Sequence, residues 1–302
     1  MKKNILVVGS VAFDSIENAR GRADRVLGGA ASYSSISASY FARPSVVAVV
    51  GTDFTNKDRA PFKKCGVDIS GLQVKQGKTF HWGGSYDKDL KNATTKFTDL
   101  NVFKDFNPVL SEAQKNVKTV FLANIDPELQ LSVLNQVKNP KLVACDTMNY
   151  WISSKKAALL KVLKKTDLFF LNEAEARQLT GEYNLIKAGK KMLKLGAKHV
   201  IIKLGPNGSM LVSKLGIVQF PPYVLENVYD TTGAGDTFGG GATGYLASQS
   251  KWDTLPAIKR AMMIGNVMAS FAIESFSVKC LAGAGEREIK KRLKSYTSML
   301  RF

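Results

Sequence analysis

The stretch Asp230-Thr-Thr-Gly-Ala-Gly-Asp-Thr-Phe-Gly-Gly-Gly241 carries the residues best suited to chemistry. Gly233 and Gly235 allow the backbone to turn where a side chain would block it. The following amides would be the unpaired N–H groups of a helix start, which bind anions such as phosphate. Asp236 would repel a phosphate unless it accepts a proton from a hydroxyl while the amides hold the phosphoryl group. The alternative is a glycine-rich turn with Asp236 as an N-cap, and spacing leaves both open.

A second group of polar residues follows two apolar, strand-like runs. Asn172 and Glu175 stand three residues apart and would share one face of a helix. Lys203 ends the next run, before Gly205 and Gly208, where its ammonium could reach a nucleotide phosphate. The alternatives are a helix cap at Asn172 with Glu175 near the helix N-terminus, and an ordinary strand-end lysine before a turn.

Asp14 follows the first apolar run, and Asp146 and Asn149 follow the run from 142 to 145. Ligands collect at the carboxyl ends of parallel strands. A carboxylate at position 14 could accept hydrogen bonds from two adjacent hydroxyls, although aspartate is also a common turn residue. We therefore expect these three residues to line a cleft.

Strands and helices alternate along most of the chain, which predicts an α/β fold with a mostly parallel sheet and helices on both faces. The 302 residues contain 45% hydrophobic side chains, enough for one large core. Strands are expected at 4–10, 45–51, 117–123, 142–145, 167–171, 198–203 and 218–228. Helices are expected at 28–42, 56–65, 127–137, 155–165, 185–195, 239–248, 256–274 and 286–300.

The segment from Lys78 to Asn101 departs from this alternation. Thr79–Tyr86 and Thr94–Thr98 flank a charged turn and read as a hairpin. A period of two would place Phe80, Trp82 and Tyr86 on one face. We expect a β-sheet lid, formed by about 11–27 and 76–101, on a single domain spanning 1–302.

The formal net charge is +18, and the three cysteines are widely spaced. The cysteine spacing favours reduced thiols and a cytoplasmic location. No apolar run approaches the length of about 20 residues that a membrane span needs. The lysines are scattered among acids, which is typical of solvated helix faces, and no nucleic-acid-binding motif is present. We therefore expect neither a membrane nor a specific nucleic acid as a partner.

Five landmarks in this order resemble the ribokinase-like (PfkB) family of sugar and nucleoside kinases. They are Val8-Gly-Ser-Val-Ala-Phe-Asp14, Gly28-Gly29, Asn172-Glu-Ala-Glu175, Lys203-Leu-Gly-Pro-Asn-Gly208 and the stretch from Asp230. The resemblance spans essentially the whole chain. It implies a three-layer sandwich with a small lid, and ATP-dependent phosphorylation of an alcohol.

The resemblance also implies roles for single residues. Asp236 would be the base, and Gly233, Ala234 and Gly235 would form the anion hole. Asn172 and Glu175 would hold Mg²⁺, mostly through water. The remaining nucleotide residues would be Lys203, Gly205, Gly208, Thr232 and Asn266, and the acceptor residues would be Asp14, Gly28, Gly29, Ser32, Asp146 and Asn149. The segment Asp230–Thr232 is similar to the family's monovalent-cation loop, which makes K⁺ a candidate cofactor.

The sequence departs from the family pattern near the acceptor. Gly28-Gly-Ala-Ala-Ser-Tyr33 lacks the Asn that often follows the two glycines, and Trp151 stands where many relatives carry a basic residue. The hydroxyl-binding groups expected there include no cation, which favours a neutral acceptor. We expect a free sugar, with a nucleoside as the alternative and a silent nucleotide- or nucleic-acid-binding protein as a third reading. A homodimer through the lid is also expected, because an isolated ribbon is marginal in water.

Overall fold

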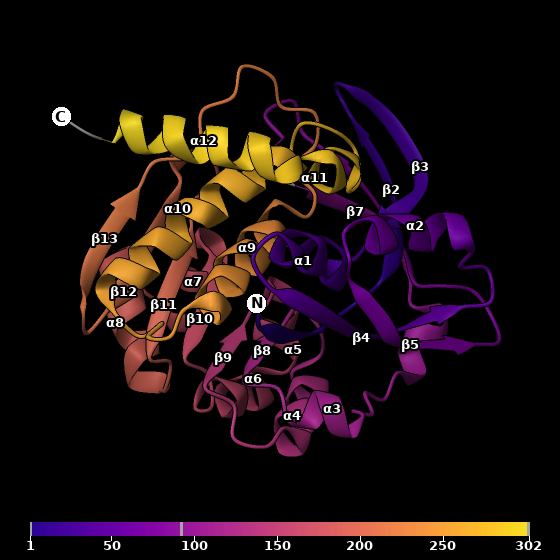
Figure 1. Cartoon of the computed structure of the whole chain (residues 1–302), viewed down its shortest axis with the longest axis horizontal. Coiled ribbons are helices and arrows are strands. Elements are labelled where there is room, and N and C mark those ends of the chain that lie inside the picture. Colours follow the sequence, from indigo (N-terminus) through magenta and orange to yellow (C-terminus); the bar gives the residue numbers. More distant parts are fainter. Residues whose placement is uncertain (1, 91–92, 301–302) are drawn as a thin grey trace.

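A nine-stranded sheet forms the centre of the molecule (Figure 1). The computed structural model describes residues 2–90 and 93–300. The strand order is β13-β12-β11-β10-β9-β8-β1-β4-β5, with every pair from β11 to β5 parallel and β12 and β13 antiparallel. The strands are β1 (Asn4–Val8), β4 (Arg43–Gly51), β5 (Asp68–Lys75), β8 (Thr119–Leu122), β9 (Leu142–Cys145), β10 (Leu168–Asn172), β11 (His199–Lys203), β12 (Ser209–Ser213) and β13 (Gly216–Phe220). The expected mostly parallel α/β sheet is confirmed.

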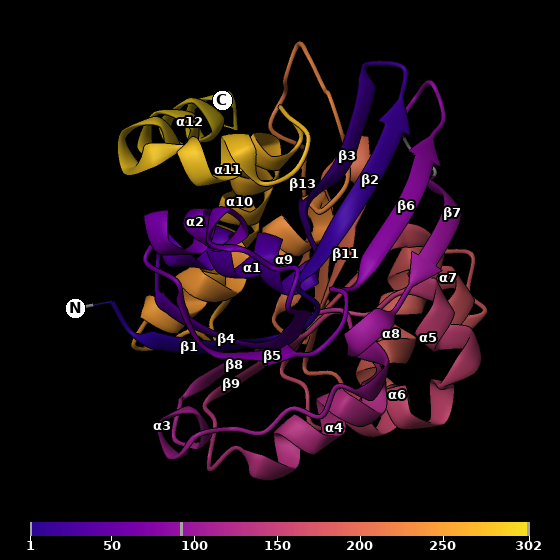
Figure 2. The same cartoon turned by 90° about the vertical axis from the view of Figure 1, so that its right-hand side faces the viewer.

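Helices cover both faces of this sheet, as Figure 2 shows. One buried cluster joins the sheet to α1 (Ala30–Ser39), α2 (Asn56–Lys64), α9 (Ala234–Ser248), α10 (Leu255–Ala272), α11 (Lys279–Gly283) and α12 (Gly285–Met299). A second cluster joins it to α4 (Pro127–Gln136), α5 (Asn149–Ser154), α6 (Lys156–Leu163), α7 (Glu173–Thr180) and α8 (Leu185–Leu195), with the short α3 (Glu112–Lys115) nearby. Successive side chains of a strand point to opposite faces of the sheet, so neighbouring residues enter different clusters. Ile5 belongs to the first cluster and Leu6 to the second. The three layers follow from this alternation.

Glycines allow α9 to lie unusually close to α1. A Cβ added to Gly240 would lie 2.1 Å from the carbonyl oxygen of Ser34, and one added to Gly244 would lie 2.8 Å from the Cα of Ala38. Larger side chains would push the two helices apart. This contact fixes α1 against the middle of α9.

The lid is a separate four-stranded sheet, with the order β3-β2-β6-β7 (Figure 2). It consists of β2 (Ala12–Asn18), β3 (Gly21–Gly28), β6 (His81–Tyr86) and β7 (Ala93–Asp99). β2 pairs with β3 and β6 with β7 antiparallel, while β2 and β6 run parallel. The expected lid is therefore confirmed, and its two halves form one sheet.

Some details of the lid differ from the sequence-based expectation. The β6–β7 register shifts between Gly83 and Gly84 because β7 carries one extra residue, Lys96, while β6 itself pairs with β2 without a shift. Phe80 precedes the strand and stacks on Phe103 at 5.4 Å, while Trp82 packs over Gly84. Tyr86 instead reaches the body of the protein. The three aromatics therefore have separate partners.

Two boundaries around the motif at Asp230 also differ. The strand expected at 218–228 ends at Phe220, because two prolines follow and proline cannot donate a ladder hydrogen bond. The helix expected from Gly239 begins at Ala234, so the motif itself forms its first turn.

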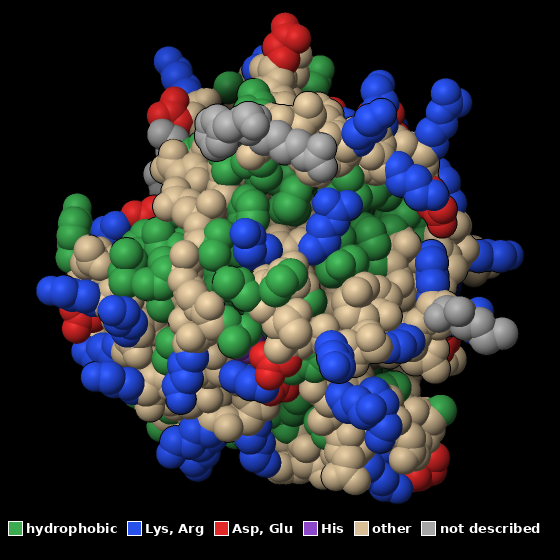
Figure 3. Space-filling model, turned by 60° about the vertical axis from the view of Figure 1, so that its left-hand side comes forward, with side chains coloured by type: hydrophobic (Ala, Val, Ile, Leu, Met, Phe, Trp, Pro, Cys, Tyr) green, Lys and Arg blue, Asp and Glu red, His purple; other side chains and the backbone are tan. Residues whose placement is uncertain are grey.

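The described part of the surface carries scattered charge. Figure 3 shows Lys and Arg side chains distributed over one face among apolar and uncharged groups. None of the helices in residues 2–90 and 93–300 combines the length and apolar character that crossing a membrane requires.

Candidate active site

Parallel strands bring three of the expected polar residues to one edge of the sheet. Asn172 pairs in register with Lys203, and β9 ends at Cys145 immediately before Asp146. These residues are separated by up to 57 positions in the sequence. Their meeting follows from the adjacency of β9, β10 and β11.

Lys203 and Asp146 form an ion pair at this edge. The Lys203 Nζ donates to Asp146 Oδ2 at 2.6 Å, and the side chains are only 16% and 2% exposed. Burial lowers the pKa of Lys203, but Asp146 and Glu175 outweigh this and hold its pKa above the usual value. A Cβ added to Gly235 would lie 3.0 Å from the same nitrogen. Glycine at position 235 therefore makes room for the ammonium beside the start of α9.

The first turn of α9 carries the Asp236 carboxyl group and the Gly235 amide, which has no hydrogen-bond partner among the described residues. Gly233 precedes the helix in the left-handed conformation, with φ of 73°, which favours glycine. Asp236 lies in the first helical turn and is half-buried. Burial, and then the negative charge of Asp146, raises the pKa of Asp236 to about 7. A carboxylate with this pKa beside a helix N-terminus can accept a proton near neutral pH.

Asn172 and Glu175 form a reciprocal cap at the start of α7. Asn172 Oδ1 accepts from the Glu175 amide at 2.8 Å, and Glu175 Oε2 accepts from the Asn172 amide at 2.7 Å. Burial, opposed by Lys203, raises the pKa of Glu175 to about 7. The capping alternative is thus present in the structure. The cap occupies one carboxylate oxygen, and Oε1 makes no hydrogen bond within the described residues.

The donors at this position fit a magnesium ion held largely through water. Mg²⁺ takes one or two carboxylates, keeps several waters and binds phosphate oxygens. Glu175 Oε1 is the carboxylate oxygen at this position that could serve as such a ligand, directly or through water. Among residues 2–90 and 93–300, no three His, Cys, Asp or Glu side chains gather as a set that could hold a metal ion.

Asp14 is buried where the lid meets the body. Its carboxylate fills the space beside Gly28, because a Cβ added there would lie 1.9 Å from Asp14 Oδ2. Gly29 has φ of 88°, and a Cβ at this position would lie 2.6 Å from the Ser10 carbonyl oxygen. Burial, and then the charges of Asp230 and Asp236, raise the pKa of Asp14 to about 7. The two glycines thus position Asp14 toward the carboxylates of the motif.

Two other expected residues, Ser32 and Asn266, are engaged within the chain, and a third, Asn149, is exposed. The Ser32 hydroxyl donates to the Gly28 carbonyl at 2.6 Å, leaving only its lone pairs for a ligand. Asn266 donates to the hydroxyls of Ser209 and Tyr296 at 3.2 and 3.1 Å, as helix packing would require. Asn149 is exposed at the start of α5.

Gly205 and Gly208 form a tight turn after β11. Both have positive φ, 55° and 85°, and the Leu204 amide donates to the Gly208 carbonyl at 2.8 Å. A Cβ on Gly208 would lie 2.0 Å from the Phe220 carbonyl oxygen. The turn therefore requires glycine and ends the strand that carries Lys203.

The lid touches the motif through contacts that the sequence did not reveal. Thr232 Oγ1 lies 2.7 Å from Asp230 Oδ1 and 3.0 Å from the Tyr86 hydroxyl. With one proton, Thr232 donates to Asp230 and accepts from Tyr86. Thr231 donates to the Leu90 carbonyl at 2.7 Å. The aromatic pattern at Tyr86 marked the strand, but no sequence signal paired it with Thr232.

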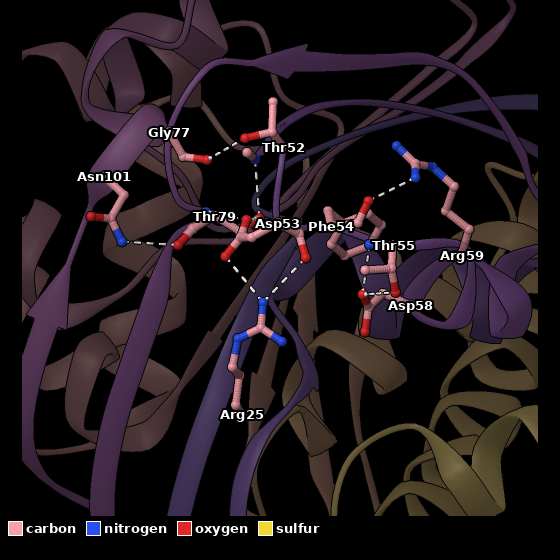
Figure 4. A network of polar contacts seen from close by, with 11 residues as sticks. Arg25, Thr52, Asp53, Phe54, Thr55, Asp58, Arg59, Gly77, Thr79 and Asn101 are labelled. Carbon is pink, nitrogen blue, oxygen red and sulfur yellow. Dashed lines mark hydrogen bonds and ion pairs between the residues drawn. The ribbon is translucent and has the colours of Figure 1, made fainter.

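A polar network anchors the base of the lid (Figure 4). Arg25 of β3 donates to Asp53 Oδ2 at 3.0 Å and lies 3.8 Å from the centre of the Phe13 ring. Asp53 Oδ1 accepts from the amide and hydroxyl of Thr79, and Asn101 donates to the Thr79 carbonyl. Both halves of the lid are thereby tied to one loop after β4.

Comparisons with known proteins agree with this architecture. Residues 2–280 match the pfkB family carbohydrate kinase domain. The cytidine kinase of Thermococcus kodakarensis is 30% identical over 254 residues, covering 82% of this chain and 89% of that protein. The crystal structure of Methanocaldococcus jannaschii nucleoside kinase has a TM-score of 0.77 at 22% identity, covering 97% of this chain and 98% of that one.

A third relative carries ligands. The structure of a putative ribokinase II from E. coli in complex with ATP and Mg²⁺ has a TM-score of 0.79 at 18% identity, covering 98% and 100% of the two chains. At this identity the likeness concerns the fold. The activity is supported by the match to the family domain and by the similarity to the Thermococcus kodakarensis cytidine kinase, which extends over most of that protein. The chain therefore belongs to the pfkB family of carbohydrate kinases and is an ATP-dependent sugar or nucleoside kinase.

Proposed function

We propose that the enzyme transfers the γ-phosphoryl group of ATP to a hydroxyl of a small neutral polyol, with Asp236 as the base. The observation that carries this proposal is the position of Asp236 in the first turn of α9, directly after Gly233. The amides of Gly233 and Gly235 have no hydrogen-bond partner among the described residues and bind the transferring group, while the carboxylate accepts the hydroxyl proton. The Ala234 amide between them donates to the Thr231 carbonyl at 3.2 Å and would have to leave it to join them. A base with a pKa of about 7 suits a loose transition state, in which the proton leaves late.

The residues around this pair hold the nucleotide. Lys203 lies beside Gly235 and is close enough to the anion hole to neutralise phosphate oxygens. Asn172 and Glu175 hold Mg²⁺, which supplies positive charge to the phosphates when bound. The turn at Gly205 and Gly208 brings backbone amides toward the same nucleotide.

Two acceptor classes each have an observation in their favour. A nucleoside is favoured by the similarity to a cytidine kinase over 89% of that protein. A free sugar is the first expectation from the sequence. It is favoured because the lid aromatics Phe80 and Trp82 already have partners within the chain, so neither is free to stack on the base of a nucleoside. We place the nucleoside first, and Asp14 as the group that accepts hydrogen bonds from its hydroxyls.

A coupled assay of ADP release tests the proposal on three matched panels. The panels are nucleosides, neutral sugars and sugar phosphates, each with ATP and Mg²⁺. We expect the highest kcat/KM for a nucleoside. A sugar phosphate that exceeded every neutral acceptor would overturn the neutral-acceptor proposal, and a neutral sugar in first place would reverse our order.

The segment Asp230–Thr232 fits a bound monovalent cation. Asp230 is 1% exposed, and its Oδ2 has no hydrogen-bond partner among the described residues. A buried, unpaired carboxylate oxygen is costly unless a cation lies beside it. Running the same assay in K⁺ and in Na⁺ tests this proposal, and we expect a higher rate in K⁺.

We also propose that the lid pairs two copies of the chain. The residues of β7 are all exposed and occupy an edge of the lid sheet, with unpaired backbone groups that favour strand pairing. Light scattering at working concentration should give the mass of a dimer. A monomeric mass would refute the pairing and leave the lid itself in place.

A further inference from the structure

Tyr33 has a buried hydroxyl with no hydrogen-bond partner among the described residues. The residue is 1% exposed and lies in the first turn of α1. Its ring lies against Gly233, where an added Cβ would come within 2.5 Å of three ring carbons. The glycine that begins the anion hole therefore also accommodates the Tyr33 ring.

The groups around this hydroxyl are hydrogen-bond acceptors. The charges of Asp14, Asp230 and Asp236 all act on Tyr33. Burial, and then the charge of Asp14, raises the pKa of Tyr33 well above its usual value, so the hydroxyl keeps its proton. The nearby Tyr86 hydroxyl is committed to Thr232. Tyr33 thus presents a free proton among carboxylates.

A hydroxyl of the acceptor substrate bound here needs both a hydrogen-bond acceptor for its proton and a hydrogen-bond donor for its oxygen. Each hydroxyl has one proton to donate and lone pairs that accept. The carboxylates of Asp14 and Asp236 can only accept while ionised, so they can take the proton and cannot satisfy the lone pairs. Lys203 is already paired with Asp146. Tyr33 is the donor that completes the hydrogen bonding.

We propose that the Tyr33 hydroxyl donates a hydrogen bond to one hydroxyl oxygen of the acceptor and thereby selects that acceptor over its deoxy analogue. The proposal rests on the proposed function and deepens it. It names the chemical feature that the enzyme selects, a hydroxyl that donates to a carboxylate and accepts from a phenol. A site built to hydrogen-bond a hydroxyl discriminates strongly against an analogue that lacks it.

The position of Tyr33 in the sequence fits this role. It follows Gly28-Gly29 within the first turn of α1. The phenol lies on a rigid ring that packs against Gly233. The close packing of α1 on α9 keeps this ring in place.

The test combines Tyr33→Phe with a panel of monodeoxy analogues of the best acceptor. The substitution removes the hydroxyl and keeps the ring. For the full acceptor we expect kcat/KM to fall about 10- to 100-fold, mainly through KM. For the analogue that lacks the partner hydroxyl, we expect the same substitution to change kcat/KM less than about threefold.

Tyr40→Phe is the matched control. Tyr40 follows the same helix, and its hydroxyl donates to the Leu281 carbonyl at 2.7 Å, outside the site. This control should lower the melting temperature and leave acceptor discrimination unchanged. Tyr33→Phe should keep or raise the melting temperature, because it removes an unpaired buried hydroxyl.

The outcomes separate the two proposals. An equal loss on the full acceptor and on every deoxy analogue, or no loss at all, would overturn the role of Tyr33 while the kinase activity stands. A Tyr33→Phe variant as destabilised as Tyr40→Phe would also overturn it, since the hydroxyl would then be paired within the fold. Failure of the unmodified enzyme to phosphorylate any acceptor would overturn the proposed function itself.

Discussion

Asp236→Asn should make the enzyme nearly inactive and the fold more stable. The amide keeps the shape of the side chain and cannot accept the proton. Loss of a general base costs about 10²- to 10⁴-fold in kcat. Nucleotide binding should change little, because the amides of the first turn of α9 remain.

The stability gain follows from the pKa of this carboxyl. The ordinary value is 3.8, which applies to the unfolded chain, and the folded value is about 7. Below both pKa values the Asp236 side chain is neutral in the folded and the unfolded state, so its ionisation does not change the free energy of unfolding. As the pH rises between them, the unfolded state releases its proton first, so the folded state loses stability until the pH passes 7. Asparagine imitates the neutral acid at every pH.

The size of the effect can be worked from these values. At about 1.4 kcal/mol per pKa unit, Asp236→Asn should gain about 4 kcal/mol at pH 8 and about 2 kcal/mol at pH 5. Because Asp236 is half-buried, solvent screening makes these upper values. For a chain of 302 residues, the gain at pH 8 corresponds to roughly 6 °C in melting temperature.

The assay is urea or thermal unfolding of both proteins at pH 5 and pH 8, together with kcat and titration of ATP binding. Asp253→Asn provides a control of opposite sign. Burial raises the pKa of Asp253, but hydrogen bonds from Lys198 and His199 outweigh it and keep the pKa below its usual value. This control should lose stability and keep kcat. A stability gain for Asp236→Asn that does not grow with pH, or a near-normal kcat, would refute the reasoning.

Two further substitutions test the nucleotide side and the lid. Glu175→Gln should lower kcat and raise the Mg²⁺ concentration that gives the half-maximal rate. The control Glu173→Gln, which removes the ion-pair partner of Arg177 on the same helix, should do neither. An unchanged Mg²⁺ titration for Glu175→Gln would mean that Glu175 acts only as a helix cap. Arg25→Ala should raise the KM for the acceptor several-fold, because it releases β3 from Asp53. The loss of this ion pair should lower the free energy of unfolding by about 1 kcal/mol or less. The control Arg22→Ala, at an exposed position of the same strand, should leave this KM unchanged. Equal KM values for the two arginine variants would show that the network does not hold the lid over the acceptor.

The sheet and the approximate position of most site residues could be predicted from the sequence. The apolar runs before Asp146, Glu175 and Lys203 indicate parallel strands, and parallel strands bring their carboxyl ends to one edge. The pairing of Lys203 with Asp146 could not be predicted. It depends on the two side chains reaching each other across the end of β10, which lies between β9 and β11 in the sheet.

The contacts that orient side chains were also beyond the sequence. The ring of Tyr33 faces Gly233 only because α1 and α9 meet at Gly240 and Gly244. The β6–β7 register shifts where β7 carries the extra residue Lys96, and no pattern in the sequence indicated this bulge. Local patterns predict elements, whereas these contacts arise where elements from distant parts of the chain pack together.

Half of the six unsatisfied buried side-chain atoms in the described chain lie in or against the motif from Asp230 to Gly241, and this distribution argues that the site binds a ligand. The buried side-chain atoms without partners include Tyr33 Oη, Asp230 Oδ2 and Thr237 Oγ1, all in or against the motif. Asp14, Glu175 and Asp236 share raised pKa values of about 7 because burial opposes their charge. Each unpaired group and each buried charge costs stability, and a bound ligand can supply the missing partners. The site that costs stability in the free enzyme is therefore the one at which we propose that phosphate, cation and hydroxyl bind together.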